Sequence, residues 1–194
     1  MRGLCYDALV ISIYDCIGGH MAKPPVVDER EFLKLTRNHG EFCQKLRSLG
    51  HPAAAADLVE NAHYIGLNWL MLADEHMKDG KVAVGAGSDR AAYSRSYYAA
   101  YNASKSVRYI VAGAASLTGD DHKEASNLPH DFPDVEKWAD AITKLREHRL
   151  RADYDNWAST KLEFSIMPTE AIQLAEAFVA EAKKYLETKL GLTP

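Results

Sequence analysis

The sequence predicts an all-α protein, folded as an up-and-down bundle of about five helices. From residue 28 onward, apolar side chains recur every three or four positions, which is the spacing of one helix face. Outside residues 8 to 14, no convincing stretch has the alternating pattern that is typical of strands. With 194 residues, of which 47% are hydrophobic, the chain is long enough to bury one core. We therefore expect a single helical domain over residues 25–194.

The first 24 residues differ in composition from the rest of the chain, and we expect them to form an N-terminal extension. Their apolar stretch is interrupted by Asp7 and Asp15, and no small-residue cleavage site comes after it. Neither a signal peptide nor a membrane span is therefore predicted. Two origins remain open for residues 1–20: an upstream or vector-derived segment, or a short native strand or arm.

Two helices are predicted between residues 28 and 80. The first is amphipathic, ends at Gly50 and has a break near Gly40; its face is marked by Phe32, Leu35, His39, Phe42, Leu46 and Leu49. The second runs from Pro52 to about Gly80. Its middle is apolar on nearly all sides, which indicates that it lies centrally in the bundle.

Residues 81–90 are predicted to be a linker, after which a third helix runs from Asp89 to about Gly113. Ser88 or Asp89 is suited to cap its first turn. One face of this helix carries tyrosines at helical spacing, and we expect their rings to pack in the core with the hydroxyls hydrogen-bonded. A second, polar row is a candidate to line a groove, and it consists of Arg95, Tyr98 and Asn102.

The polar segment after this helix contains Pro129 and Pro133 and is predicted to be a loop. It holds two histidines, His122 and His130. A lone loop histidine is either solvated or functional, and the sequence leaves both interpretations open.

A fourth helix is predicted from about Asp134, and it carries Arg149 on the same face as Trp138 and Leu145. A guanidinium on an apolar face needs an anionic partner or a wet cleft, because an unpaired buried charge is costly. Asp153, one turn further on, offers an internal ion pair worth about 0.3 to 0.5 kcal/mol if it is exposed. Spacing alone favours neither the cleft nor the internal pair.

The fifth helix is predicted to begin at Pro168 and to end with the lysines that precede Gly191. Glu170 lies in its first turn. Acidic residues at the start and basic residues at the end are the arrangement that the helix dipole favours.

Composition limits the functions that the protein can have. The formal net charge is -4, from 23 Lys and Arg against 27 Asp and Glu. This balance argues against a protein that coats nucleic acid by general electrostatics, but it allows a local basic cleft. The three cysteines, Cys5, Cys16 and Cys43, lack metal-ligand spacing. We therefore expect reduced thiols in a cytoplasmic protein, with no metal and no cofactor.

Two motifs give the chain a resemblance to a known family. The segment "SRSYYAAYNASKSV" resembles the tyrosine- and alanine-rich helix of HEPN domains, and "LREHRLRADYDN" resembles their Arg-x-x-Ala-Asp-Tyr segment. The two motifs occur in the family's order, and their spacing suits a helical bundle. The resemblance covers roughly residues 55–190, so that residues 28–50 are an added N-terminal helix.

The resemblance implies a helical bundle that forms a homodimer with paired clefts at the interface. Many HEPN domains are metal-independent ribonucleases, often toxins or defence effectors partnered with a minimal nucleotidyltransferase as antitoxin, and others are non-catalytic binding modules. Active members carry an arginine, then four to six residues, then a histidine. Arg149 matches the arginine, whereas Tyr154 holds the position of the histidine.

That departure bears on catalysis. RNA cleavage by internal transfer needs a base for the 2′-hydroxyl, an acid for the leaving oxygen and a cation for the phosphorane. Arg149 is the candidate for the cation. Tyrosine, whose ordinary pKa is about 10, is a poorer proton shuttle at neutral pH than histidine at about 6.5. His148 and His122 are the candidates to replace the motif histidine, from another helix or subunit.

The sequence supports three hypotheses for the function. The first is a dimeric module of a toxin–antitoxin or defence system, which binds RNA, a nucleotide or a partner protein through an arginine-lined interface cleft. Its binding residues are Arg95, Tyr98, Asn102, His122 and Asp153. The alternative is a metal-independent endoribonuclease toxin with the catalytic residues Arg149, Tyr154 and His148. The second alternative is a purely structural helical bundle.

Overall fold

The computed structural model describes residues 32–34, 37–116, 121–155 and 164–191. Over these residues the fold is helical and contains no named strand; the β-bridge in this part of the chain pairs Asn38 with Ala114. The prediction of an all-α bundle is confirmed, with five helices of ten residues or more among the described residues. The predicted extension over residues 1–24 lies outside the described residues.

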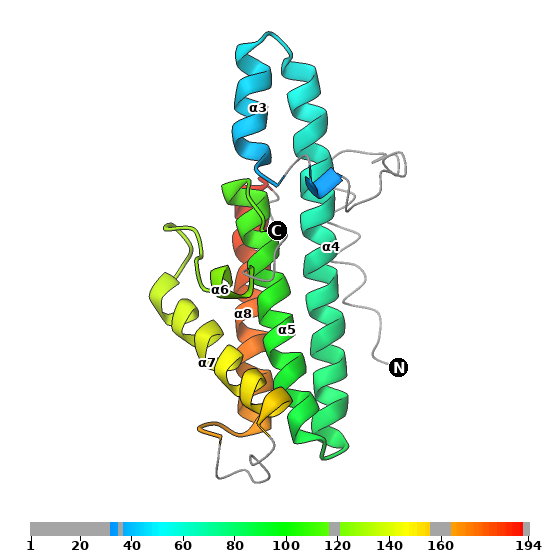
Figure 1. Ribbon diagram of the computed structural model, residues 1–194, viewed down its shortest axis with the longest axis vertical. Helices are drawn as coiled ribbons and strands as arrows, with labels where there is room; N and C mark the ends of the chain where they lie inside the picture. The colour runs from blue at the N-terminus through cyan, green and yellow to red at the C-terminus, as the bar shows by residue number, and fades with distance from the viewer. Residues whose placement is uncertain (1–31, 35–36, 117–120, 156–163, 192–194) are drawn as a thin grey trace.

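The long helices run in alternating directions along the chain (Figure 1). The elements are α3 (His39–Ser48), α4 (Pro52–Gly85), α5 (Asp89–Val107) with its π-helical continuation η1 (Arg108–Ala112), the single turn α6 (Asp121–Glu124), α7 (Val135–Tyr154) and α8 (Pro168–Lys189). α5 is the central helix, because it packs against α4, α7 and α8. α4 extends past the rest of the bundle, and α3 packs against its N-terminal part (Figure 1).

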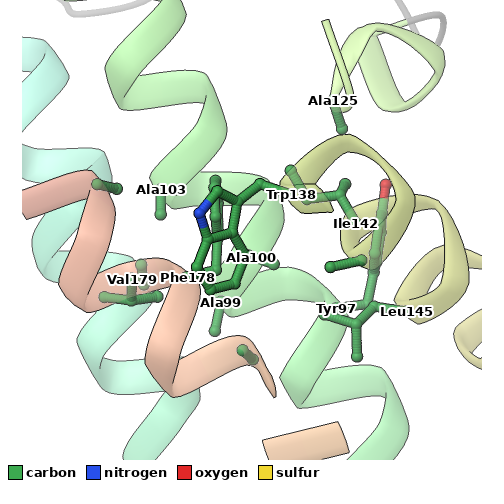
Figure 2. Close-up of a cluster of buried hydrophobic side chains, with 14 of the residues drawn as sticks. Tyr97, Ala99, Ala100, Ala103, Ala125, Trp138, Ile142, Leu145, Phe178 and Val179 are labelled. Atoms are coloured by element: carbon green, nitrogen blue, oxygen red, sulfur yellow. The ribbon is translucent and has the colours of Figure 1, made fainter. Parts of the chain in front are cut away.

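Small side chains on α5 allow its neighbours to approach closely. Ala99, Ala100 and Ala103 are completely buried. Figure 2 shows these alanines in one cluster with Trp138 from α7 and Phe178 from α8. The two aromatic rings have their centroids 5.5 Å apart. Complete burial of a large apolar side chain contributes about 1.5–3 kcal/mol, so the alanines provide the space and the aromatic rings provide much of the stabilisation.

The boundary between the second and third helices differs from the prediction. α4 continues to Gly85, so the expected end near Gly80 is wrong and residues 81–85 belong to the helix rather than to a linker. Gly80 is buried within α4, where a β-carbon would lie 2.4 Å from Cδ1 of Ile172 in α8. This glycine serves close helix packing, although in sequence it looks like a helix end. Ser88 occupies the N-cap position of α5, but its side chain makes no capping hydrogen bond.

The remaining boundaries are close to those predicted. α3 begins at His39, so the expected break lies just before Gly40. η1 ends before Gly113, α7 begins at Val135 and α8 begins at Pro168. The predicted loop between the third and fourth helices is wrong in one part, because residues 121–124 form the helical turn α6.

Backbone and side-chain contacts join the start of α3 to the end of η1. Gly40 N donates to Gly113 O at 3.3 Å, and Ala115 N donates to the carbonyl of residue 37 at 2.7 Å. The buried imidazole of His39 donates from Nε2 to Tyr109 O at 2.7 Å and packs edge-on against the Tyr109 ring. The added N-terminal helix is therefore tied to the end of the central helix.

Two expectations from composition can be compared with the described residues. Cys43 is a buried free thiol, while Cys5 and Cys16 lie outside the described residues. In the part of the chain that the structure describes, none of the helices combines the length and the apolar character needed to cross a membrane.

We expect Gly113→Ala to destabilise the fold more than Gly87→Ala. Both glycines have positive φ, 72° and 69°, where an L residue costs about 1–2 kcal/mol. Only at Gly113 would the new β-carbon meet backbone, at 2.7 Å from Gly40 N, whereas nothing lies within 4 Å at Gly87. Overpacking of this kind adds about 1–3 kcal/mol. Urea unfolding of the two variants measures the difference, and equal losses in the free energy of unfolding would contradict the tight α3–η1 junction.

Candidate functional site

Arg149 lies near the C-terminal end of α7, and its side chain is only 14% exposed. Leu145, one turn earlier, is buried in the core, so the helix periodicity carries the guanidinium to the edge of that core. Arg149 Nε lies 2.7 Å from Asp153 Oδ2, in an ion pair without the alignment of a hydrogen bond. The internal pair that the spacing offered is therefore present, but it is not the only contact of this guanidinium.

Two tyrosines complete the surroundings of Arg149. Its Nη2 donates to the hydroxyl of Tyr98 at 2.8 Å and, at 3.4 Å, to that of Tyr154. The guanidinium carbon lies 5.4 Å from the Tyr98 ring centroid and 5.2 Å from that of Tyr154, within the range of cation–π attraction. Tyr98 comes from α5, whereas Tyr154 ends α7 and is 68% exposed. We call Arg149, Asp153, Tyr98 and Tyr154 the arginine–tyrosine cluster.

His122 lies beside this cluster because α6 packs on α5. Its ring centroid is 6.1 Å from that of Tyr98 and 4.4 Å from that of Tyr101. Its Nδ1 lies 2.9 Å from the hydroxyl of Tyr97. Burial, and after it the positive charge of Arg149, lowers the pKa of His122. The imidazole is therefore predominantly neutral at pH 7.

Arg95 reaches the neighbourhood of the cluster together with His76 of α4. Arg95 Nη1 donates to His76 Nδ1 at 3.1 Å, and Arg95 Nε lies 3.7 Å from a carboxylate oxygen of Asp79. The His76 ring centroid is 5.5 Å from that of Tyr98. Burial, followed by the charge of Arg95, lowers the pKa of His76. No sequence signal indicated His76, because only the packing of α4 against α5 brings it to Tyr98.

Two of the predicted site residues have other surroundings. Asn102 is buried and donates to the carbonyl of Tyr98, one turn earlier in the same helix, at 2.8 Å. His148 is buried, stacks on the Tyr93 ring with centroids 5.4 Å apart, and has Nε2 3.0 Å from Ser165 Oγ. Among the described residues, no hydrogen bond, ion pair or ring contact joins either side chain to Arg149. The structure thus gathers Arg95, Tyr98, His122, Asp153 and Tyr154 near Arg149 but sets Asn102 and His148 apart.

A buried ion pair adjoins His122 and was not selected from the sequence. Asp121 accepts hydrogen bonds from the Tyr101 hydroxyl at 2.6 Å and from Arg108 Nη1 at 3.2 Å. Burial by itself raises the pKa of Asp121, but the Tyr101 hydrogen bond and the cations of Arg108 and Lys105 outweigh it, so that the pKa is lowered. The signal that could have found this network is the spacing of residues 101, 105 and 108 along one helix face.

The chemistry of the site is set by these groups. In the described part of the chain, no group of three or more His, Cys, Asp or Glu side chains could hold a metal ion. The cluster instead offers a fixed guanidinium and an exposed aromatic ring, and the neutral imidazole of His122 lies beside it. A guanidinium binds phosphate or carboxylate oxygens, an aromatic ring stacks on a nucleobase, and a neutral imidazole can accept a proton.

Comparison with known proteins gives one family relationship for this chain. Residues 67–188 match the family model described as HEPN domain. The matched range contains the arginine–tyrosine cluster and His122, whereas α3 and the first part of α4 precede it. Neither a curated protein nor a solved structure gave a significant match.

Acid is expected to destabilise the fold. Burial lowers the pKa of His39, His122 and His148 in the native protein. The unfolded chain, with histidine pKa values of about 6.5, therefore binds more protons as the pH falls below about 6.5, and the free energy of unfolding decreases. His148→Phe should weaken this pH dependence while it keeps a ring against Tyr93. Urea unfolding at about pH 7 and about pH 5.5 measures both proteins, and an unchanged pH dependence in the variant would contradict a neutral, buried His148.

Proposed function

Because the chain belongs to the HEPN domain family, we propose that it is a module that binds single-stranded RNA at the arginine–tyrosine cluster. HEPN domains are generally RNA-related or nuclease-like modules. The observation that carries the proposal is the pairing of a fixed guanidinium, Arg149, with the exposed ring of Tyr154. This pairing suits a nucleotide, because the cation can meet a phosphate while the ring stacks on an unpaired base.

The contacts of Arg149 leave part of its guanidinium for a ligand. Among the described residues, its hydrogen bonds and its ion pair use Nη2 and Nε, so that Nη1 can donate to a phosphate oxygen. Arg95, whose side chain is 43% exposed, adds a second cation near Tyr98. Binding is thus expected to depend on these local charges, since the net charge of -4 gives no general attraction to RNA.

A second candidate function is metal-independent RNA cleavage, and the position of His122 favours it. A neutral imidazole beside Tyr98 can act as the base for a 2′-hydroxyl. Arg149 can stabilise the charge of the phosphorane. Tyr154 occupies the place of the family's histidine, and its hydroxyl, 3.4 Å from Arg149 Nη2, would donate the proton to the leaving oxygen. His148 has no direct part in this mechanism, because its ring packs against the stacked rings of Tyr93 and Phe164.

We further propose that the protein acts as a homodimer, as HEPN domains often do. Leu150 and Tyr154 are exposed apolar side chains one turn apart on α7. A second copy of the chain over this surface would bring two arginine–tyrosine clusters together. A cytoplasmic toxin–antitoxin or defence system, with a nucleotidyltransferase as a further partner, is the setting that the family resemblance implies.

Light scattering tests the dimer. At micromolar concentration we expect about twice the 21.5 kDa of one chain. Leu150→Glu should shift the protein toward the mass of one chain, because a charge is costly in a buried interface. Val82→Glu is the matched control, since Val82 is an exposed apolar residue that belongs to α4 rather than to α7. A monomeric wild type would contradict the proposal.

Arg149→Ala should weaken the binding of single-stranded RNA. Removal of one charged hydrogen-bonding group costs about 1.5–3 kcal/mol, which is about a 10- to 100-fold loss in affinity. The substitution also removes the contacts of a mostly buried side chain with Tyr98 and Asp153, so the free energy of unfolding should fall by about 0.5–3 kcal/mol. Fluorescence anisotropy with a labelled RNA, at one fixed salt concentration, gives the affinities. Arg151→Ala, which removes an exposed positive charge from the same helix, is the matched control. Unchanged affinity in a folded Arg149→Ala protein would contradict the role of the cluster.

The same RNA, analysed on a denaturing gel without divalent metal, separates binding from cleavage. Slow or absent cleavage by the wild type is expected, because general acid–base assistance is worth about 100- to 10,000-fold and Tyr154 replaces the family's histidine. Tyr154→His should raise cleavage, and the addition of Arg149→Ala should remove the gain. If the wild type cleaves with His122 as the base, His122→Asn should abolish cleavage and leave RNA binding intact. Vigorous cleavage that survives both Tyr154→Phe and His122→Asn would place the chemistry at another site.

A further inference from the structure

The position of His122 depends on support from outside its own helix. α6 is a single turn of four residues, Asp121–Glu124. A helix of this length is not stable by itself in water, because its few hydrogen bonds do not offset the cost of nucleation. The orientation of the imidazole must therefore come from contacts that α6 makes with the rest of the fold.

The carboxylate of Asp121 makes the contacts that fix the start of α6. Asp121 is 2% exposed and accepts hydrogen bonds from the hydroxyl of Tyr101 and from Arg108 Nη1, at 2.6 and 3.2 Å. Lys105 Nζ lies 3.7 Å from the same carboxylate. These three partners occur at spacings of four and three residues along α5 and η1, so that one face of the central helix holds Asp121.

A second contact fixes the residue directly after α6. Ser104 Oγ donates to the carbonyl of Ala125 at 2.5 Å, and both residues are buried. Ser104 belongs to the same helix as Tyr101. The short turn that carries His122 is therefore fastened to α5 on both sides of the histidine.

Tyr101 links Asp121 directly to His122. Its hydroxyl donates to the carboxylate, and its ring lies 4.4 Å, centroid to centroid, from the imidazole. The other constraint on the imidazole is the hydroxyl of Tyr97, 2.9 Å from Nδ1. A movement of Asp121 would therefore displace the ring against which His122 packs.

We infer that Asp121 is a positioning residue, which acts through Tyr101 and Arg108 to fix the imidazole of His122 beside the arginine–tyrosine cluster. A buried ion pair adds little net stability compared with well-packed apolar side chains, but its directional hydrogen bonds define one geometry. The Arg108–Asp121 pair thus serves the placement of α6. Any effect of the His122 position on RNA binding or cleavage rests on the proposed function, whereas the positioning of His122 by Asp121 does not.

Charges around His122 give the inference a measurable signature. Arg149 and Arg146 of α7 and Lys105 of α5 each lower the pKa of His122, after burial, which is the largest cause, while Asp121 raises it. Removal of the Asp121 charge should therefore lower the pKa of His122 further. Loss of the fixed geometry should also change the balance between the Nδ1–H and Nε2–H tautomers, because the Tyr97 hydroxyl would no longer face Nδ1 in one arrangement.

The experiment is an NMR titration of the histidine side chains in the full-length protein without RNA, with His122→Asn to assign the signal. In Asp121→Asn we expect a lower His122 pKa and altered ring-nitrogen shifts. Asp131→Asn is the matched control, because Asp131 also accepts from a tyrosine, Tyr185, at 2.8 Å and pairs with a lysine, Lys189. The control should leave the His122 signal unchanged. An unchanged His122 pKa and unchanged nitrogen shifts in a folded Asp121→Asn protein would overturn the inference.

Two further variants keep the inference testable if Asp121→Asn does not fold. Arg108→Met combined with Asp121→Asn removes both members of the buried Arg108–Asp121 pair together, so that neither charge of this pair is left without the other. Tyr101→Phe keeps the ring and removes only the hydroxyl that reaches Asp121. Both should change the ring-nitrogen shifts of His122, and unchanged shifts in both would again overturn the inference.

RNA affinity, measured on the same samples, tests the proposed function separately. Altered His122 shifts together with no RNA binding by the wild type would support the positioning role of Asp121 and reject the RNA-binding module.

Discussion

Three helices pack against α5 because that helix presents methyl groups where larger side chains would hold its neighbours at a distance. Ala99, Ala100 and Ala103 bury completely, and the aromatic rings of Trp138 and Phe178 occupy the space that they leave. The same requirement is stricter on α4, where Gly80 lies so close to α8 that even a methyl group would meet Ile172. The bundle thus combines small side chains at the helix contacts with large ones between them, as close packing at native density requires.

The close packing around α5 also constrains the tyrosines of that helix. A helix surrounded on several sides can carry tyrosines only if each buried hydroxyl finds a partner, because an unsatisfied polar group is costly in the core. The partners come from different elements: Tyr93 donates to Ile166 O, Tyr97 meets His122, Tyr98 accepts from Arg149, and Tyr101 donates to Asp121. The hydroxyls therefore connect the central helix to α6, to α7 and to the segment before α8. The candidate site lies where the partners are charged or titratable.

The proposed function uses both kinds of group at this site. Arg149 is fixed by its contacts with Tyr98 and Asp153, so a ligand phosphate would meet a guanidinium that needs little reorganisation. Tyr154 remains exposed and can stack on a base. His122 would serve catalysis rather than binding, because its neutral imidazole can accept a proton. The buried Asp121 would not act on the ligand; it holds His122 in place through Tyr101. The match to HEPN domains covers all of these residues, whereas α3 is outside it and is joined to the bundle at Gly113.

The sequence by itself determined the five long helices and the face of α7 that carries Arg149, because hydrophobic periodicity and a helix repeat of about 3.6 residues are local properties. It also provided the two motifs of the family. The tertiary structure decided which polar groups meet: His76 of α4 reaches Tyr98, and Asp121 of α6 reaches Arg108 of η1. His148 and Arg149 are neighbours in sequence, yet they project about 100° apart around the helix axis. One therefore packs against Tyr93 and the other against Tyr98. Such pairings depend on how helices that are distant in the chain pack together, and periodicity along one helix carries no information about the neighbour that its face will meet.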